Sequence, residues 1–327
     1  MERIIDGRLF EGKRKLDAWE VRIWEQAGHR EISGSNVIEW TEVGAAPSAR
    51  PKGLLPGSLV LDKDEMAKLL LRERADAEQR RIDNLKRNAN RAKTACRRII
   101  KAEGFDELLT LTYRENQQDR ALCKAHFKEW VRRMKAHLGG VFRFCASFEK
   151  QDRGAMHVHL AVHKLPKSAV HKGSKIEGWR LGTAVWHTVV GKDNGLCYVG
   201  GKNRSGNQKR KPIGQAKMAA YVSKYIMKDY ADAEASSNRY SRSNGIPVGR
   251  PQVLRFDGAA LADIISMVFT CNDGDVVVSH SASEDRGSYW LCTENPAARR
   301  TTEGTMVDAA AARARQISML LAMGSKP

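Results

Sequence analysis

The feature that most constrains the fold is Met156–His163, a stretch in which histidine alternates with aliphatic residues (MHVHLAVH). Side chains of a β-strand point alternately to its two faces, so this pattern predicts a strand with one apolar and one imidazole face. The aliphatic side chains would face a core, whereas His157 and His159 would lie about 6–7 Å apart on the opposite face. The sequence therefore predicts a sheet that buries one face here and carries a polar site on the other.

Two histidines on one face of a strand can bind a single cation, and a carboxylate from the neighbouring strand can complete the site. Glu149 ends the preceding predicted strand and would fall opposite the start of the histidine strand. Asp152 in the intervening turn and His163 on the histidine face are alternative ligands. Mixed nitrogen and oxygen ligands with open positions suit Mg²⁺ or Mn²⁺ beside a phosphate, although zinc would also bind. The competing interpretation is a pair of exposed histidines without a metal.

A second stretch, Tyr221–Lys228 (YVSKYIMK), places two tyrosines and two lysines on one side of a predicted helix. At about 100° per residue, Tyr221, Lys224, Tyr225 and Lys228 fall within an arc of roughly 100°. A protonated phenol is a poor nucleophile, and an adjacent ammonium favours the phenolate. The alternative is a packed tyrosine stripe, but the apolar residues of this helix lie on another side. We therefore interpret the tyrosines as nucleophiles and the lysines as their partners.

Composition favours a polyanionic partner. The 56 lysines and arginines exceed the 38 acidic residues, which gives a formal net charge of +18 and a pI near 9.8. Such a surplus attracts nucleic acids. The six cysteines show no C-x-x-C pairing, which argues against a zinc ribbon or a disulfide framework and fits a reducing cytoplasm. No apolar run approaches the ~18–20 residues that span a bilayer, and no secretory signal is evident, so we expect a cytoplasmic protein without membrane contact.

The middle of the chain alternates strand and helix patterns. Predicted strands cover 108–113, 141–148, 156–163 and 196–199, and predicted helices cover 119–138, 180–190 and 215–230. The order β-α-β-β-α-β, followed by a further helix, predicts an α+β fold: an antiparallel sheet in a split βαβ (ferredoxin-like or RRM-like) arrangement, with helices on one face. The other face would be open to a nucleic acid strand. The residues of the 119–138 helix expected to face inward are Leu122, Phe127, Trp130, Val131 and Met134.

Five segments follow from composition and periodicity. They are an N-terminal extension of uncertain fold at 1–60, a long basic amphipathic helix at 61–104, the sheet-forming core at 105–230, a linker at 231–251 and a small C-terminal module at 252–327. Asp62 and Glu65 form a capping-box pattern at the start of the long helix. The C-terminal module would hold a strand near Asp275–His280 and a helix from about Met306 to Met323.

Basic residues cluster on the long helix and in the loop at 200–217. Between Arg80 and Lys101 there are nine basic residues and one acid, Asp83, so the charge is not neutralised within the helix. A solvated charged face is the alternative to phosphate contact. The residues predicted to contact DNA are Arg80, Arg87, Arg91, Arg98, Arg114, Lys209, Arg210 and Lys211.

Together these motifs resemble the HUH endonucleases, specifically the two-tyrosine rolling-circle replication initiators of bacteriophages and plasmids. LLTLTY, ending at Tyr113, looks like the first strand motif of that family. MHVHLAV looks like its histidine–hydrophobe–histidine motif, and YVSKYIMK looks like its two-tyrosine motif. The three motifs occur in the expected order, and the resemblance covers about residues 80–230.

The resemblance implies an HUH core at 105–230 in which the two histidines and Glu149 bind a divalent metal and both tyrosines are nucleophiles. The family nicks one strand at an origin, becomes joined to the 5′ phosphate and leaves a 3′ hydroxyl. If one tyrosine suffices, Tyr225 is favoured. Implied partners are single-stranded origin DNA, a host DNA polymerase and a separate helicase, because Gly7–Arg14 fails as a P-loop: Arg14 stands where Ser or Thr must bind magnesium. The implied location is the cytoplasm of a bacterial host.

Two other functions remain open at this point. One is a transposase with the same chemistry, which the chain alone does not separate from a replication initiator. The other is a non-catalytic single-stranded nucleic-acid-binding protein that uses the sheet face and the basic helices. Such a protein needs stacking aromatic residues, which make up 7% of this chain, and would keep its function when Tyr221 and Tyr225 are changed to phenylalanine.

Overall fold

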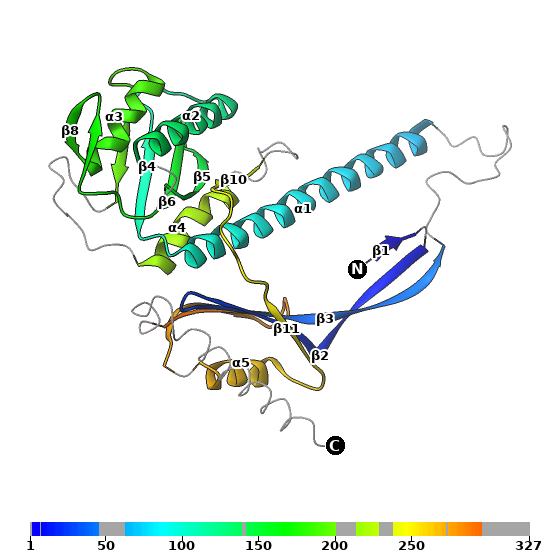
Figure 1. The fold of residues 1–327 in the computed structure, drawn as a ribbon. Helices are drawn as coiled ribbons and strands as arrows, with labels where there is room; N and C mark the ends of the chain where they lie inside the picture. The colour runs from blue at the N-terminus through cyan, green and yellow to red at the C-terminus, as the bar shows by residue number, and fades with distance from the viewer. Residues whose placement is uncertain are drawn as a thin grey trace. The chain divides into compact units, whose positions relative to one another are not determined.

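The computed structural model describes residues 2–6, 8–45, 63–138, 142–200, 214–228, 238–272 and 274–295. It shows a mixed α+β protein with antiparallel sheets and, within these residues, five α-helices (Figure 1). The chain forms two compact units: Asp76–Val248, and Met1–Ala75 together with Gly249–Pro327. In the described residues, each helix is too short or too polar to cross a membrane.

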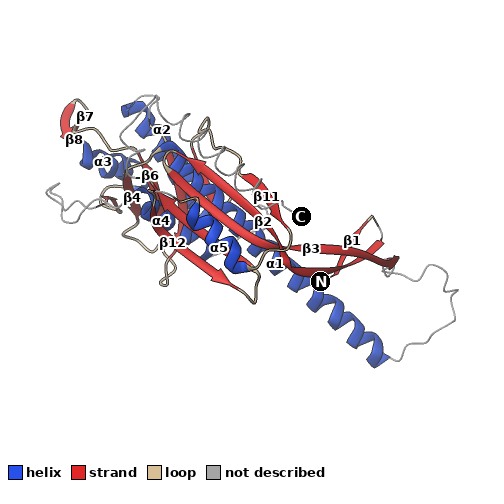
Figure 2. Ribbon diagram, turned by 90° about the horizontal axis from the view of Figure 1, so that it is seen from below, coloured by secondary structure: helices blue, strands red, loops and turns tan. Residues whose placement is uncertain are grey.

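The unit that contains the chain ends is built on a six-stranded antiparallel sheet. Its strands are β1 (Glu2–Ile5), β2 (Arg8–Gln26), β3 (His29–Ala45), β11 (Gln252–Phe256), β12 (Val276–Ser283) and β13 (Ser288–Glu294). The order is β1-β2-β3-β13-β12, and β11 pairs with β2. Helix α5 (Leu261–Thr270) lies along one face and packs on Trp19, Ile32 and Leu291 (Figure 2).

This sheet joins two regions that the sequence assigned to separate segments, 1–60 and 252–327. The long hairpin β2–β3 turns at Ala27 and Gly28, both with positive φ (51° and 73°), as a two-residue type I′ turn requires. The sequence did not predict the pairing because β3 and β13 are far apart along the chain, and local periodicity does not report such partners. Asp62 and the predicted helix at Met306–Met323 lie outside the described residues.

The second unit, Asp76–Val248, contains a five-stranded antiparallel sheet in the order β10-β5-β6-β4-β9. Its strands are β4 (Glu107–Thr112), β5 (Phe144–Lys150), β6 (Met156–Val162), β9 (Leu196–Val199) and β10 (Tyr240–Arg242). Its helices are α2 (Arg120–Leu138), α3 (Gly178–Val190), α4 (Gln215–Lys228) and, from Asp76 on, α1 (Lys63–Glu103). A small hairpin, β7 (Ser168–His171) and β8 (Ser174–Glu177), precedes α3.

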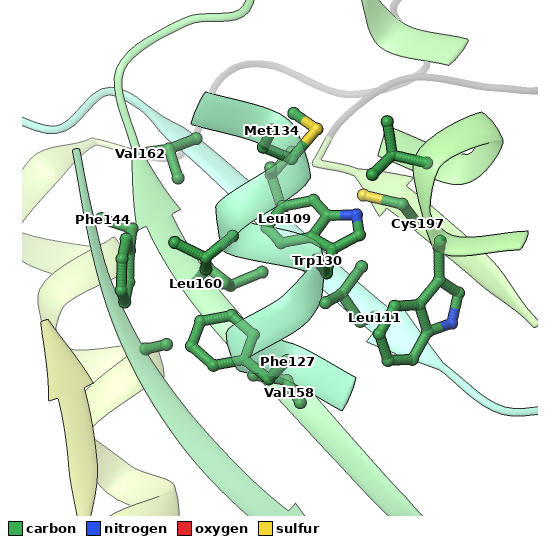
Figure 3. Packing of buried hydrophobic residues seen from close by; sticks show 14 of the residues in the cluster. Leu109, Leu111, Phe127, Trp130, Met134, Phe144, Val158, Leu160, Val162 and Cys197 are labelled. Atoms are coloured by element: carbon green, nitrogen blue, oxygen red, sulfur yellow. The ribbon is translucent and has the colours of Figure 1, made fainter. Parts of the chain in front are cut away.

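One face of this sheet packs on α2 and α3 through an apolar core. Phe127 and Trp130 of α2 lie against Val158 and Leu160 of β6 (Figure 3). The aliphatic residues of the histidine strand are fully buried there, which confirms that they face a core. Leu122 was expected in this core, but it is 42% exposed, and Cys123 is buried instead. The expectation was wrong because steps of three and then four back from Trp130 lead to Phe127 and Cys123.

The opposite face carries helices as well, so the predicted arrangement with helices on one face only is wrong. Helix α4 and the C-terminal part of α1 pack there in a second apolar cluster that includes Cys96 of α1, Val222 of α4, Cys145 of β5 and Ala161 of β6. Small apolar residues at these strand positions provide a floor on which a helix can pack. The cover spares β4 and β9, where Leu196 and Tyr198 are 37% and 56% exposed.

The predicted elements of this unit lie within a few residues of the observed ones, whereas several short elements were missed. β10 lies inside the predicted linker at 231–251 and pairs with β5. The β7–β8 hairpin and, in the other unit, β11, β13 and α5 were also not predicted. Strands of three to five residues are too short to show a period, so only their partners identify them.

Candidate metal and tyrosine site

The site is built on two adjacent strands of the Asp76–Val248 unit. In the antiparallel pair β5–β6, Glu149 lies directly opposite His157, and Ser147 lies opposite His159. All four side chains therefore point to the face that α4 covers. The predicted position of the carboxylate, across the turn from the first histidine, is the one that the register gives.

Three ligand atoms converge on this face. One from each of Glu149, His157 and His159 lies within 4.8 Å of the other two, as a common cation requires. His159 Nε2 is 2.8 Å from Glu149 Oε2, and His159 Nδ1 is 3.2 Å from Thr110 Oγ1. Thr110 thus fixes the orientation of one imidazole from the neighbouring strand, in the manner of an outer-shell partner of a metal ligand.

The Nε2 atom of His157 is buried, and none of the described residues gives it a hydrogen-bond partner. A buried polar atom without a partner is costly, so this nitrogen is placed for a ligand. The nitrogen and carboxylate donors fit a divalent cation but do not identify the metal. The alternative ligands lie elsewhere, because Asp152 bonds Lys228 and His163 Nε2 bonds Glu103 at 3.2 Å.

The ionisation of these groups suits metal binding. Burial, with the neighbouring His159 as a second cause, lowers the pKa of His157 to about 4, so its imidazole is neutral near pH 7. Burial by itself raises the pKa of Glu149, but hydrogen bonds from His159 and Lys228 outweigh it and leave the pKa below its usual value. A neutral imidazole and an ionised carboxylate are the forms that bind metals.

Helix α4 brings both tyrosines over the imidazole pair. It is held on the sheet by Ser147, whose Oγ donates a hydrogen bond of 2.7 Å to the carbonyl of Val222. The ring of Tyr225 stacks on that of His159, with centroids 4.1 Å apart and an angle of 11° between the planes. The ring of Tyr221 meets the same imidazole edge-on at 5.5 Å. The structure thus brings together the two motifs that the sequence identified separately.

Tyr225 is the more enclosed of the two tyrosines, with 8% of its surface exposed, whereas Tyr221 is half-buried. Burial, a hydrogen bond with Tyr221 and the negative charge of Glu149 all raise the pKa of Tyr225 well above its ordinary value. Its phenol is therefore protonated near pH 7 in the metal-free protein. A positive charge added beside Glu149 acts in the opposite direction.

The two predicted lysine partners have different neighbours. Lys224 Nζ lies over the rings of Tyr221 and Tyr225, 4.5 and 4.7 Å from their centroids, in a cation–π arrangement. Lys228 Nζ instead donates to Glu149 Oε1 at 3.0 Å and to Asp152 Oδ1 at 3.3 Å, and the hydrogen bond with Glu149 is the main reason that its pKa is raised. One lysine thus faces the tyrosines and the other faces the carboxylate.

The predicted DNA-contacting residues are spread over several elements. On α1, Arg80, Arg87 and Arg91 are exposed and Arg98 is half-buried. Lys209, Arg210 and Lys211 lie outside the described residues. Arg114 is exposed and lines a pocket that also reaches His157.

Sequence reasoning missed four residues near the site. Ser147 and Thr110 support α4 and His159, and Arg153 and Tyr198 line the pocket beside His157. For Tyr198 there was a usable signal: in Leu196–Val199 (LCYV), the alternate residues Leu196 and Tyr198 must share a face with each other.

Comparison with known proteins gives one family. Residues 106–230 match the family of replication-associated proteins of the ORF2 type, which is a little more than a third of the 327 residues. The matched region contains every residue of the metal and tyrosine site. The comparisons with curated proteins and with solved structures gave no match.

Proposed function

We propose that this protein nicks single-stranded DNA at a replication origin through a tyrosine nucleophile and thereby starts rolling-circle replication. The observation that carries this proposal is the stacking of Tyr225 on His159, which is one member of the Glu149–His157–His159 group. Tyrosine, imidazole pair and carboxylate then all face one place, where a single phosphate can meet them. The match of residues 106–230 to a replication-associated family supports the same process.

The topology supports an HUH-type core. Strand β6 lies between β4 and β5, antiparallel to both, and α2 connects β4 to β5. This is the split βαβ arrangement that the sequence predicted. The histidine motif lies on the central strand, and the two-tyrosine motif lies on the helix that packs above it.

The proposed reaction is a transesterification. The phenol oxygen of Tyr221 or Tyr225 forms a bond to phosphorus, the bond from phosphorus to the 3′ oxygen breaks, the phenol loses its proton and the 3′ oxygen gains one. A divalent cation held by Glu149, His157 and His159 would polarise the phosphate oxygens and favour the phenolate. The ammonium of Lys224, over both rings, adds positive charge beside either nucleophile.

A second tyrosine allows a second cleavage. One tyrosine holds the first DNA end as a phosphotyrosine ester while the other attacks the regenerated origin and transfers the strand. The two rings are 5.3 Å apart, so both phenols can serve one metal site in turn. The 3′ hydroxyl would be extended by a host polymerase, and a separate helicase would unwind the duplex.

A gel assay for a covalent adduct tests this proposal. The protein is incubated with a labelled single-stranded DNA pool of random sequence and Mn²⁺ or Mg²⁺, and the mixture is then denatured. We expect a slowly migrating protein–DNA band that disappears with a chelator and in the Tyr221→Phe, Tyr225→Phe double variant. Tyr240→Phe, in β10 of the same unit, is the matched control and should leave the band intact. If wild type with either metal gives no adduct, or the double variant still forms one, the proposal fails.

Nucleic acid binding without catalysis is the second candidate, because Tyr198 offers an exposed aromatic surface on the same sheet face. That function predicts unchanged DNA affinity and no adduct in either the wild type or the double variant. The gel assay therefore separates the two candidates, when affinity for the same pool is measured in parallel by fluorescence anisotropy.

A further inference from the structure

A pocket of about 460 Å³ adjoins the candidate metal site, and neither the sequence motifs nor the proposed chemistry uses it. It lies within the Asp76–Val248 unit, between the start of the histidine strand and the end of β9. Its size is that of a site for a small organic ligand. The described residues that line it are Thr112, Tyr113, Arg114, Arg153, His157, His187, Asp193, Gly195, Leu196 and Tyr198.

The pocket lies on the part of the sheet face that α4 leaves bare. In the sheet register Thr110 pairs with His159 on one side and with Tyr198 on the other, so these three residues form a row across the face. Thr112 pairs with Leu196 in the next row. Tyr198 and Leu196 are 56% and 37% exposed, so an aromatic and an aliphatic surface continue the metal-site face outwards.

The chemistry of the pocket fits one nucleotide of a DNA strand. A base can stack on the ring of Tyr198, because every base has a π-face and such stacking tolerates any sequence. Arg114 and Arg153 are exposed and supply positive charge for the adjoining phosphates. Gly195 keeps the wall close, since a Cβ atom there would collide with the carbonyl oxygen of Thr112.

The pocket and the tyrosines lie on opposite sides of the imidazole pair. Tyr221 and Tyr225 contact His159 from α4, which packs over β5 and β6. The pocket instead includes His157 and extends over β4 and β9, and neither tyrosine lines it. In an in-line displacement at phosphorus, the leaving oxygen departs on the side opposite the nucleophile. A phosphate between the two would therefore direct its leaving 3′ oxygen towards the pocket.

We propose that this pocket binds the nucleoside that carries the leaving 3′ oxygen, with its base stacked on Tyr198. This inference rests on the proposed nicking function and adds its substrate polarity: the base immediately 5′ of the cleaved bond enters the pocket. Tyr198 is a specificity-determining residue in this scheme, and Arg114 and Arg153 bind the phosphates upstream of the nick.

Sequencing of the cleavage products tests the polarity. Wild type and Tyr198→Ala are each incubated with a random single-stranded pool and Mn²⁺, and both the released 3′-hydroxyl fragments and the protein-bound fragments are sequenced. We expect Tyr198→Ala to weaken base preference at the position 5′ of the nick and to leave the position 3′ of it unchanged. KM for a selected substrate should rise roughly tenfold, from the loss of one stacked base, with a smaller change in kcat. Tyr198→Phe should retain wild-type behaviour.

An abasic substrate gives the complementary measurement. Removal of the base 5′ of the nick should raise KM for the wild type to about the level seen with Tyr198→Ala and should have little further effect on that variant. Removal of the base 3′ of the nick should weaken both proteins equally. A preference that changes only on the 3′ side, or a uniform loss at all positions in Tyr198→Ala, overturns the inference.

Photocross-linking separates this inference from the nicking function, because it needs no cleavage. Oligonucleotides that carry 5-iodouracil are irradiated with the Tyr221→Phe, Tyr225→Phe variant in the presence of a chelator, and the cross-linked peptide is identified by mass spectrometry. We expect the cross-link at Tyr198. Cross-linking there by a protein whose wild type forms no adduct refutes nicking but retains the nucleotide pocket. Nicking by wild type without a cross-link at Tyr198 refutes the pocket alone.

Discussion

The two faces of the β10-β5-β6-β4-β9 sheet are made by alternate residues of the same strands, yet they differ in every physical respect. The face towards α2 and α3 holds large aromatic and aliphatic side chains that are almost fully buried. The face towards α4 holds small apolar residues, two imidazoles, a carboxylate and a buried nitrogen without a described partner. The comparison teaches that one face stabilises the unit and thereby allows the other to keep costly polar groups in place.

Trp130→Ala should give the largest effect, because it removes the largest side chain of the stabilising face. The ring is fully buried and its Nε1 donates a hydrogen bond of 3.0 Å to the carbonyl of Gly182. We expect the free energy of unfolding to fall by about 3–5 kcal/mol. Urea denaturation followed by circular dichroism measures it. Leu122→Ala, at an exposed position of the same helix, is the control and should change stability by less than about 0.5 kcal/mol.

His157→Leu should have opposite effects on metal binding and on stability. Loss of a ligand should weaken Mn²⁺ binding by about 100-fold or more, since outer-shell changes alone cost up to about that much. The metal-free protein should be as stable as wild type or more stable, because a buried nitrogen without a described partner is removed. Calorimetric titration and urea denaturation measure the two quantities. A strongly destabilised variant would show that this face also carries stability, and the comparison would fail.

The pH dependence of stability gives a second measurement on the same variant. In the folded metal-free protein the pKa of His157 is about 4, against an ordinary value of 6.5. Between these values the unfolded chain binds a proton that the folded protein does not, so stability falls as pH decreases from about 6.5 to about 4. His157→Leu should lack this part of the acid destabilisation. An identical slope in wild type and variant over that range would contradict the assignment.

Ser147→Ala tests the connection between the sheet and the tyrosine helix. The hydroxyl is fully buried and bonds the carbonyl of Val222, so its loss should cost about 1 kcal/mol. Because Val222 lies between the two tyrosines in sequence, adduct formation should fall more than overall stability suggests. Ser223→Ala, one residue further along α4, is the control, since its hydroxyl bonds only Ala220 within the same helix. Equal adduct formation by Ser147→Ala and wild type would show that the hydrogen bond does not position the tyrosines.

Much of the second unit could be predicted from sequence, and the reason is period. The alternation in Met156–His163 identifies both the strand and the faces of its residues, and a short turn fixes Glu149 opposite His157. The step of four in α4 places both tyrosines on one side. Non-local partners could not be predicted this way: Ser147 with Val222, the row that ends in Tyr198, and the cover on the second face. The sheet of the other unit failed for the same reason, since it pairs strands from the two ends of the chain.

Lys228→Met should have the smallest effect, and its sign separates two roles. In the metal-free protein the ammonium of Lys228 bonds Glu149 Oε1, while Oε2 faces His159. A cation must compete with that ammonium, which is 43% exposed, so its removal should tighten Mn²⁺ binding by about two- to fivefold. Lys224→Met is the matched control and should leave the affinity unchanged, because Lys224 lies over the tyrosine rings. Weaker Mn²⁺ binding by Lys228→Met in calorimetric titration would show that the lysine holds the carboxylate in place for the metal. Lys228 would then belong to the metal site and not to its competitors.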